Sequence, residues 1–310
     1  MSFKHFLLFS FSSSLFTFFA GCDEIAHPLI QKQVYSNLPT TPPAYRDSST
    51  NYNVYKVLLE DAMGHTCSNC PLAVYAGDAI IAPSNSLSSQ TVLLEENIGG
   101  YADTVTLSGY PNYAFKKDYR CEAGNNWLSK FTINLFPWGM INRAGYPSNM
   151  FVVYGNWSDS VTSQISKNPL PSVTINIHDS CWTSPRIIGA EFQLTFKKAL
   201  TGNYLLETLI MEDSIIDWQL DNSVAYGADS LFVHRNVLRG SFDLVGTGIT
   251  IPSTASSVVN GSWTSYQTYD FVKGENGKAA SWNMAHCYIV AFVYNQSNYE
   301  VVQAEMVKIE

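Results

Sequence analysis

Apolar residues recur at two different spacings along this chain, and the spacing changes near residue 169. Before that point, short apolar runs of strand length alternate with segments whose apolar residues fall three or four positions apart, the spacing of one helix face. The predicted strands are 54–61, 91–97, 138–143 and 150–155, and the predicted helices are 67–81, the second half of 117–131, and 156–167.

The order of these elements predicts an α/β domain over residues 53–168. Two strands separated by a helix form a parallel pair, because the chain must cross over between them, and that crossover is right-handed. The two later strands are close in sequence and predict a hairpin, and a further helix follows it.

After the segment "PLPS" at residues 169–172, apolar and polar residues alternate with a period of two. This alternation is typical of strands with one buried face. Seven such runs at short spacing predict an all-β region over residues 169–310, an antiparallel β-sandwich of immunoglobulin-like or jelly-roll-like form. The runs are 173–177, 188–196, 204–211, 232–242, 263–272, 287–294 and 301–309.

The first residues have the layout of a secretory signal, with Lys4 ahead of an apolar stretch over residues 6–20. The ending Ala20-Gly21-Cys22 resembles a bacterial lipobox, which predicts a lipoprotein signal peptide over 1–21 and a lipid on Cys22. The alternative is an ordinary secretory signal with an incidental cysteine. Residues 22–52 are rich in Pro, Ser, Thr and Asn and predict a flexible linker. We therefore expect a cell-envelope location, facing the periplasm or the surface, with the membrane as a partner through the anchor.

Composition narrows the class of partner. Charged residues make up only 14% of the chain, aromatic residues another 14%, and the net charge is −8. Few charges with many Tyr, Thr, Ser and Asn are typical of extracytoplasmic β-rich proteins. The acidic balance argues against nucleic acid as a partner. No phosphate-binding loop, G-x-S-x-G or H-E-x-x-H motif is present, so no cofactor and no metal is predicted.

The stretch "GHTCSNCP" places Cys67 and Cys70 two residues apart at the start of a predicted helix. Unpaired N–H groups and the helix dipole there favour a thiolate, so Cys67 is predicted as an exposed nucleophile and Cys70 as a buried resolving thiol. His65 could add positive charge beside Cys67. An inert structural disulfide between the same cysteines is a serious rival in an oxidising compartment. Zinc would need a second ligand pair, and the sequence contains no other C-x-x-C.

Three further cysteines lie downstream. Cys181 and Cys287 share the inward parity of their predicted strands, so both point into the expected sandwich core. They either form a second disulfide or remain two buried free thiols. Cys121 is left over, as a third thiol near the pair or a small buried residue.

A cysteine pair at the first helix, within this order of elements, resembles the thioredoxin fold. By that resemblance Pro137, directly before the first hairpin strand, is a cis proline that faces the pair and holds the substrate backbone. Asp61, six residues before Cys67, corresponds to the buried acid that moves the proton of the second cysteine. Thr66 stands where thioredoxin oxidoreductases place tryptophan.

Longer motifs resemble a specific family. The segments "KVLLEDAMGHTCSNCP", "DYRCEAGNNW", "FPWGMINR", "HRNVLRGSF" and "IVAFVYNQSNYEVVQA" are similar to the twenty-eight-kilodalton outer-membrane protein family of Bacteroidetes. The resemblance implies a thioredoxin-like domain followed by a β-sandwich in an envelope lipoprotein, with a role in binding or adhesion to a protein or an envelope or host ligand. The alternative function is an envelope thiol–disulfide oxidoreductase that uses Cys67 and Cys70.

Overall fold

The computed structural model describes residues 46–47, 51–184, 186–275 and 281–309. One compact unit spans Thr40–Glu310. The predicted signal peptide and Cys22 lie outside the described residues, as does most of the predicted linker. Within that linker, the two-residue strand β1 (Arg46–Asp47) pairs with β6 (Val173–Trp182), so this piece of the linker is part of a sheet.

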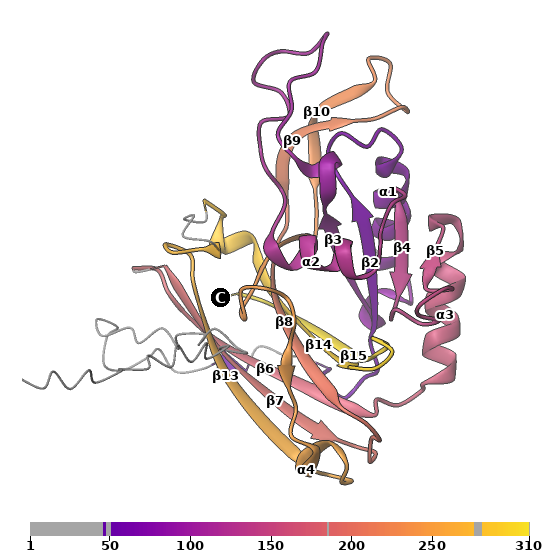
Figure 1. Ribbon diagram of the computed structural model, residues 1–310, viewed down its shortest axis with the longest axis vertical. Coiled ribbons are helices and arrows are strands. Elements are labelled where there is room, and N and C mark those ends of the chain that lie inside the picture. The colour runs from indigo at the N-terminus through magenta and orange to yellow at the C-terminus, as the bar shows by residue number, and fades with distance from the viewer. Residues whose placement is uncertain (1–45, 48–50, 185, 276–280, 310) are drawn as a thin grey trace, which may run out of the picture. The chain divides into compact units, whose positions relative to one another are not determined.

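The first half of the unit has the predicted thioredoxin-like arrangement (Figure 1). The strand β2 is parallel to β3 with α1 between them in the chain, β4 is antiparallel to β2, and β5 is antiparallel to β4. The predicted strands and helices of residues 54–167 are therefore confirmed, with shifted ends. Their bounds are β2 (Val57–Met63), α1 (Cys70–Ile81), β3 (Thr91–Asn97), α2 (Glu122–Lys130), β4 (Trp138–Ile141), β5 (Phe151–Val152) and α3 (Trp157–Lys167).

The second half contributes most of its strands to two larger sheets. The order β15-β14-β8-β11-β3-β2-β4-β5 forms one sheet, to which β12 adds by pairing with β8, and β1-β6-β7-β13 forms another. The bounds are β7 (Ile187–Phe196), β8 (Tyr204–Glu212), β9 (Ile215–Leu220), β10 (Ala228–His234), β11 (Val237–Ser241), β12 (Ile249–Thr250), α4 (Ser253–Ser256), β13 (Ser262–Asp270), β14 (Cys287–Asn295) and β15 (Val301–Lys308).

An antiparallel β-sandwich over residues 169–310 is not confirmed, because strands from both sides of residue 169 share the large sheet. The junction is β11, which is parallel to β3 at Val237 and Glu95 and antiparallel to β8. The physical reason is visible in β8, whose nine residues are all buried. A strand that is apolar on both faces needs a packed layer on each side and cannot leave one face to solvent.

Two core clusters lie on the opposite faces of this shared sheet. On one face, Leu206 and Ile210 pack toward the apolar residues of β6 and β7. On the other face, Leu209 packs with Leu58, Leu94 and Trp127, so α2 covers strands from both halves. The opposite face of β2 and β3 is covered by α1 and α3 through a third cluster.

One predicted strand, 232–242, is two strands in the structure. The strand β10 ends at His234 and β11 begins at Val237, and Asn236 between them has φ of 50°. The strand β9, which was not predicted, pairs only with β10 among the described strands. The β9–β10 hairpin stands at one end of the large sheet, near α1 (Figure 1).

Candidate functional site

The Cys67–Cys70 pair forms a disulfide at the amino end of α1. The Cα atoms are 5.4 Å apart, Cys70 is the first residue of the helix, and Pro71 occupies an early position where a missing N–H costs little. Cys70 is fully buried, and Cys67 is only 5% exposed. The prediction of an exposed Cys67 is therefore wrong in this state, because another part of the chain covers it.

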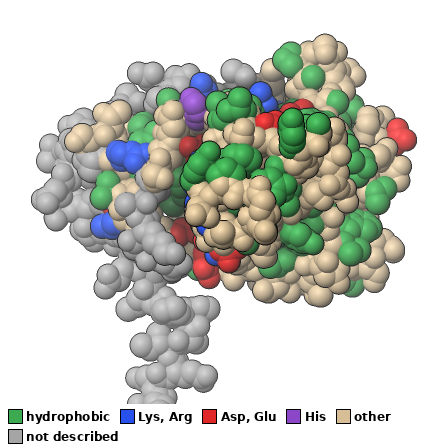
Figure 2. Space-filling view, turned by 90° about the horizontal axis from the view of Figure 1, so that it is seen from above, with side chains coloured by type: hydrophobic (Ala, Val, Ile, Leu, Met, Phe, Trp, Pro, Cys, Tyr) green, Lys and Arg blue, Asp and Glu red, His purple; other side chains and the backbone are tan. Residues whose placement is uncertain are grey.

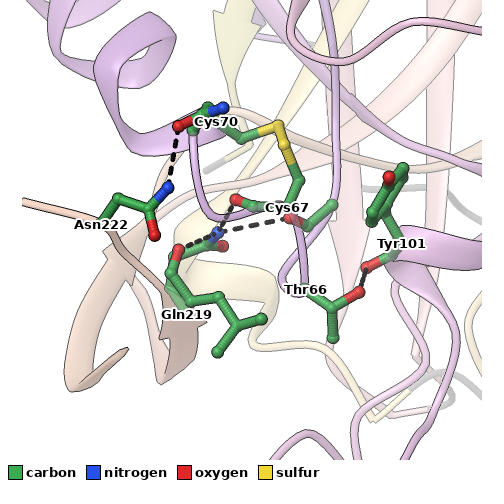
Figure 3. Close-up of a disulfide and its surroundings, with 9 residues drawn as sticks. Thr66, Cys67, Cys70, Tyr101, Gln219 and Asn222 are labelled. Carbon is green, nitrogen blue, oxygen red and sulfur yellow. Dashed lines mark hydrogen bonds between the residues drawn. A yellow bond between two sulfur atoms is a disulfide. The ribbon is translucent and has the colours of Figure 1, made fainter. Parts of the chain in front are cut away.

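The cover is the β9–β10 hairpin (Figure 3). The side-chain amide of Gln219 donates to the carbonyl oxygen of Cys67 at 3.0 Å and to that of Gly64 at 3.3 Å. The Leu220 N–H donates to the His65 carbonyl at 2.8 Å. The hairpin backbone is thus fixed to the loop that precedes the cysteines.

The turn of the hairpin is held to the segment between the two cysteines. The backbone N–H of Asn222 donates to the Ser68 carbonyl at 3.0 Å, and its side-chain amide donates to the Asn69 side-chain oxygen at 3.0 Å. Beneath these polar contacts, Phe232 of β10 packs with both cysteines, Met63 and Val74 in one apolar cluster. The disulfide is therefore sealed by polar contacts above and apolar contacts around it.

A second segment closes the other side of the loop. Thr66 donates both its backbone N–H and its hydroxyl to the Tyr101 carbonyl, at 3.1 and 3.0 Å. The close approach requires glycine at residue 64, where a Cβ atom would lie 2.4 Å from the Tyr101 carbonyl carbon.

The Phe136–Pro137 peptide bond is cis, as predicted. The strand β4 begins directly after it, and Ala62 pairs with Trp138, so the loop lies opposite the end of β2. Phe136 packs against the cluster that contains the cysteines. The role of Pro137 in holding a substrate stays a prediction.

Asp61 lies on the α1 side of β2, two residues before Met63 on the same strand face. It is 1% exposed, and neither carboxylate oxygen has a hydrogen-bond partner among the described residues. Burial raises the pKa of Asp61 well above its usual range. Its register partner Glu95 on β3 is equally buried and unpartnered, and burial raises its pKa well above the usual range too. The part of Asp61 in proton transfer stays a prediction.

His65 does not supply the positive charge expected beside Cys67. The side chain is buried, Nε2 lies 2.8 Å from the Asp103 carbonyl oxygen, and the ring contacts Phe115 and Tyr119 edge-on. Burial lowers the pKa of His65 from its ordinary value, which disfavours the positively charged ring.

Cys181 and Cys287 are free thiols, so the predicted second disulfide is not formed; Cys287 is buried, as the alternative of two buried thiols predicted, whereas Cys181 is only half-buried. The Cys287 thiol donates to the Asn283 carbonyl at 3.3 Å, and burial raises its pKa to about 12. Cys121 is also free and buried, and its sulfur accepts the Gly124 N–H at the start of α2. It is a helix cap in this structure.

Two shallow cavities lie along the loop between α2 and β4, and Thr66 of the cysteine loop lines the first of them. A cavity of about 430 Å³ and one of about 230 Å³ share Ile133, on the loop between α2 and β4. Leu135 of this loop and Tyr101 are half exposed. We call the two cavities together the loop groove. It is lined by Thr66, Gly99, Gly100, Tyr101, Leu128, Ile133, Asn134, Leu135, Phe136, Trp138, Ser148 and Phe151.

Within the described residues, no three His, Cys, Asp or Glu side chains gather closely enough to hold a metal ion. No helix in the same part of the chain is both long and apolar enough to span a membrane.

Sequence reasoning missed Gln219, Asn222 and Phe232, which make the cover. Gln219 is 152 residues away from Cys67 along the chain. The alternation in "IIDWQL" could have indicated a strand, but nothing in the sequence joins that strand to the cysteine loop.

Comparisons with known proteins place the fold. No protein-family model matches the sequence, and no curated protein matches it. HBP35 of Porphyromonas gingivalis is similar in structure, with a TM-score of 0.59 and 12% identity, over 83% of this chain and 76% of that one. A domain of the outer membrane lipoprotein Omp28 from Porphyromonas gingivalis aligns over 45% of this chain and 89% of its own, at 18% identity and a TM-score of 0.30. The likeness to HBP35 fits the thioredoxin-like arrangement and concerns the fold alone.

Proposed function

We propose that this protein is a cell-envelope lipoprotein that binds a protein or another envelope or host ligand, with the Cys67–Cys70 disulfide as a structural staple. The observation that carries the proposal is the burial of both sulfurs beneath the β9–β10 hairpin. A disulfide that reacts with other proteins must be reached by a thiolate, whereas a staple need not be. The proposed location rests on the leader, on Cys22 as its lipid site, and on the family resemblance of the motifs.

The loop groove is the binding surface that this proposal favours. Its lining is mainly apolar, and the half-exposed side chains of Tyr101 and Leu135 stand at it. Concave apolar surfaces with a few polar groups are the usual form of ligand sites. The net charge of −8 disfavours nucleic acid as the ligand.

The test compares ligand retention from envelope and host extracts by three variants and the wild type. Leu135→Asp places a charge in the groove and should abolish retention, while Leu170→Asp, at an exposed residue outside the groove, should not. A Cys67→Ser, Cys70→Ser double variant that folds should retain the same ligand. Loss with the double variant but not with Leu135→Asp would contradict the staple and the groove together.

A second function is favoured by one specific arrangement. A cis Pro137 next to Phe136, which packs on the cysteine cluster, together with a buried Asp61 under α1, resembles the site of thiol–disulfide oxidoreductases. In that function Cys67 attacks a substrate disulfide and Cys70 resolves the mixed disulfide. A Cys70→Ser variant in cells would then accumulate mixed disulfides on Cys67, and their absence after cell-wide thiol trapping would exclude the function.

A further inference from the structure

We infer that the β9–β10 hairpin is a removable cover, and that thiols reach the Cys67–Cys70 disulfide only when this hairpin leaves while the rest of the fold stays intact. The inference goes beyond the proposed function, because it concerns access to the disulfide whether the pair is a staple or a reactive site.

The closed position depends on a small set of contacts from the hairpin to the loop 64–69. Gln219, Leu220 and Asn222 donate hydrogen bonds to backbone or side-chain oxygens of that loop. The donors lie on the cover and the acceptors lie on the cysteine loop, so all of these bonds break together if the hairpin moves away.

Phe232 fills the space next to the sulfurs. It is 4% exposed and packs with Met63, Cys67, Cys70 and Val74. Its ring also contacts Tyr75 of α1, with ring centres 6.4 Å apart. Removing this side chain would leave an apolar gap beside the disulfide that a small thiol reagent can enter.

Several features of the hairpin favour local opening while the rest of the fold stays intact. Among the described strands it pairs with no third strand, and its register shifts between Asp229 and Phe232. A two-stranded hairpin is marginally stable without further packing. Its outward residues Tyr226 and Leu231 are 91% and 71% exposed, and Figure 2, viewed toward this end, shows hydrophobic side chains in several separate patches.

Other contacts also hold the cover and must give way when it opens. Trp218 of β9 contacts the rings of Tyr110 and Phe115, with centres 6.2 and 5.9 Å apart. The Tyr119 hydroxyl donates to Asp217 at 3.1 Å. These contacts come from the segment between β3 and α2, and the Tyr75 hydroxyl of α1 donates to Asp221 at 3.4 Å. Opening therefore separates the hairpin from that segment and from α1 as well as from the cysteine loop.

The chemical step that reports opening is exchange with a small dithiol such as dithiothreitol. A reagent thiolate bonds to Cys67 Sγ, the Cys67–Cys70 bond breaks, and the Cys70 sulfur leaves with the electron pair and takes a proton. The second reagent thiolate then displaces Cys67 Sγ, which is protonated in turn, and the reagent closes its own disulfide. The cysteine pair is reduced by two electrons and the reagent is oxidised by two.

The experiment measures the rate of this reduction in the full chain. The reaction is quenched with an alkylating reagent at each time point, and mass spectrometry measures the fraction of alkylated protein. The disulfide should be reduced about tenfold faster in Phe232→Ala and in Gln219→Ala than in the wild type, because the reduction rate follows the population of the open hairpin. Leu231→Ala, on the same strand with an exposed side chain, should react at the wild-type rate. Wild type in concentrated urea gives the rate for a fully open disulfide and should be far faster.

Global unfolding is separated from local opening by measuring the unfolding rate of each variant under the same conditions. The inference predicts that reduction outpaces global unfolding in every variant. If reduction never exceeds the unfolding rate, or if native wild type is reduced as fast as the urea-unfolded chain, the hairpin is not a removable cover. Asn222→Ala loses only an exposed hydrogen bond, and if Phe232→Ala fails to fold it serves in its place, with a smaller acceleration expected.

Discussion

Two buried carboxyl groups without hydrogen-bond partners are the single residues that most clearly lower the stability of this fold. Asp61 and Glu95 lie in register on neighbouring strands, both almost fully buried and both without a hydrogen-bond partner among the described residues. Taking a carboxylate out of water disfavours its charged form. Each of these groups therefore holds its proton more tightly in the folded chain than in the unfolded chain.

Asp61→Asn should change how stability depends on pH. Well below pH 4 the carboxyl is protonated in both the folded and the unfolded chain, so folding does not bury a charge. As the pH rises, the unfolded chain ionises first, and the wild type loses stability until the pH passes the raised folded-state pKa of Asp61. The variant lacks this loss, so its stability relative to the wild type should increase from acidic to mildly alkaline pH.

Urea unfolding of both proteins across this pH range measures the effect. Asp159→Asn, at an exposed residue in the first turn of α3, is the control for replacing an aspartate outside the core. A difference between wild type and Asp61→Asn that does not vary with pH would contradict the account of Asp61.

The opposite case is Glu60, whose charge is compensated. Arg143 Nε donates to its two carboxylate oxygens at 3.0 and 2.9 Å, and the guanidinium lies 4.8 and 4.9 Å from the ring centres of Trp127 and Phe131. Arg143→Met should cost about 3–5 kcal/mol, because it leaves the fully buried Glu60 carboxyl without its partner.

The double variant Arg143→Met, Glu60→Gln also replaces the Glu60 carboxyl that has lost its partner. It should recover part of the loss in urea unfolding experiments. If the double variant is less stable than Arg143→Met alone, the penalty does not come from the unpaired carboxylate.

For single residues, the sequence predicted the secondary-structure position better than the charge or the bonding state of the side chain. The thioredoxin resemblance assigned Asp61 and Pro137; the structure has Asp61 buried on β2 and a cis peptide bond before Pro137, and the site roles of both residues stay predictions. The charge of His65 could not be predicted, because it depends on Phe115 and Tyr119, which come from a loop without periodicity. Nor could the sequence decide between a second disulfide and free thiols at Cys181 and Cys287.

At the scale of elements, the disulfide joins the start of α1 to the loop before it. Replacing both cysteines by serine should cost about 2 kcal/mol, the loop-closure value for a ring this short. Urea unfolding of the double variant measures the loss, and reduced wild type should show a similar one. No loss of stability in either protein would contradict the staple.

Local patterns predicted the elements near the site because helix and strand spacing is read from neighbouring residues. The strand β3 was predicted with its observed ends, and α1 began three residues later than predicted because Cys67 lies in the loop before it. The β9–β10 hairpin was not predicted. Residues 232–242 were predicted as one strand, whereas in the structure β10 ends before Arg235 and Asn236 and β11 begins after them. Its attachment to the cysteine loop is a long-range contact that no local spacing encodes.

At the scale of the whole described unit, the large sheet makes residues 51–168 dependent on the rest. Leu58, Leu94 and Trp127 pack in one cluster with Leu209 and Phe292, which come from β8 and β14. A fragment of residues 51–168 would expose this cluster to water. It should therefore lack a cooperative urea transition, whereas residues 51–310 should unfold cooperatively.

Tryptophan fluorescence during urea unfolding distinguishes these outcomes, since Trp127 and Trp157 lie in the fragment. A fragment with a sharp transition and a stability close to that of the longer chain would show that residues 53–168 form an independent domain, as the change of period near residue 169 suggested. That period change marks a change of strand pairing, and it does not reveal that β8 is buried on both faces.

The central claim is that the β9–β10 hairpin closes over the disulfide, and amide hydrogen exchange of the oxidised protein tests it most directly. The Leu220 and Asn222 N–H groups donate to the carbonyl oxygens of His65 and Ser68. Both amides should exchange far more slowly than in an unfolded peptide, despite their place at the end of a two-stranded hairpin. If both exchange at unprotected rates in the folded protein, the hairpin does not cover the cysteines.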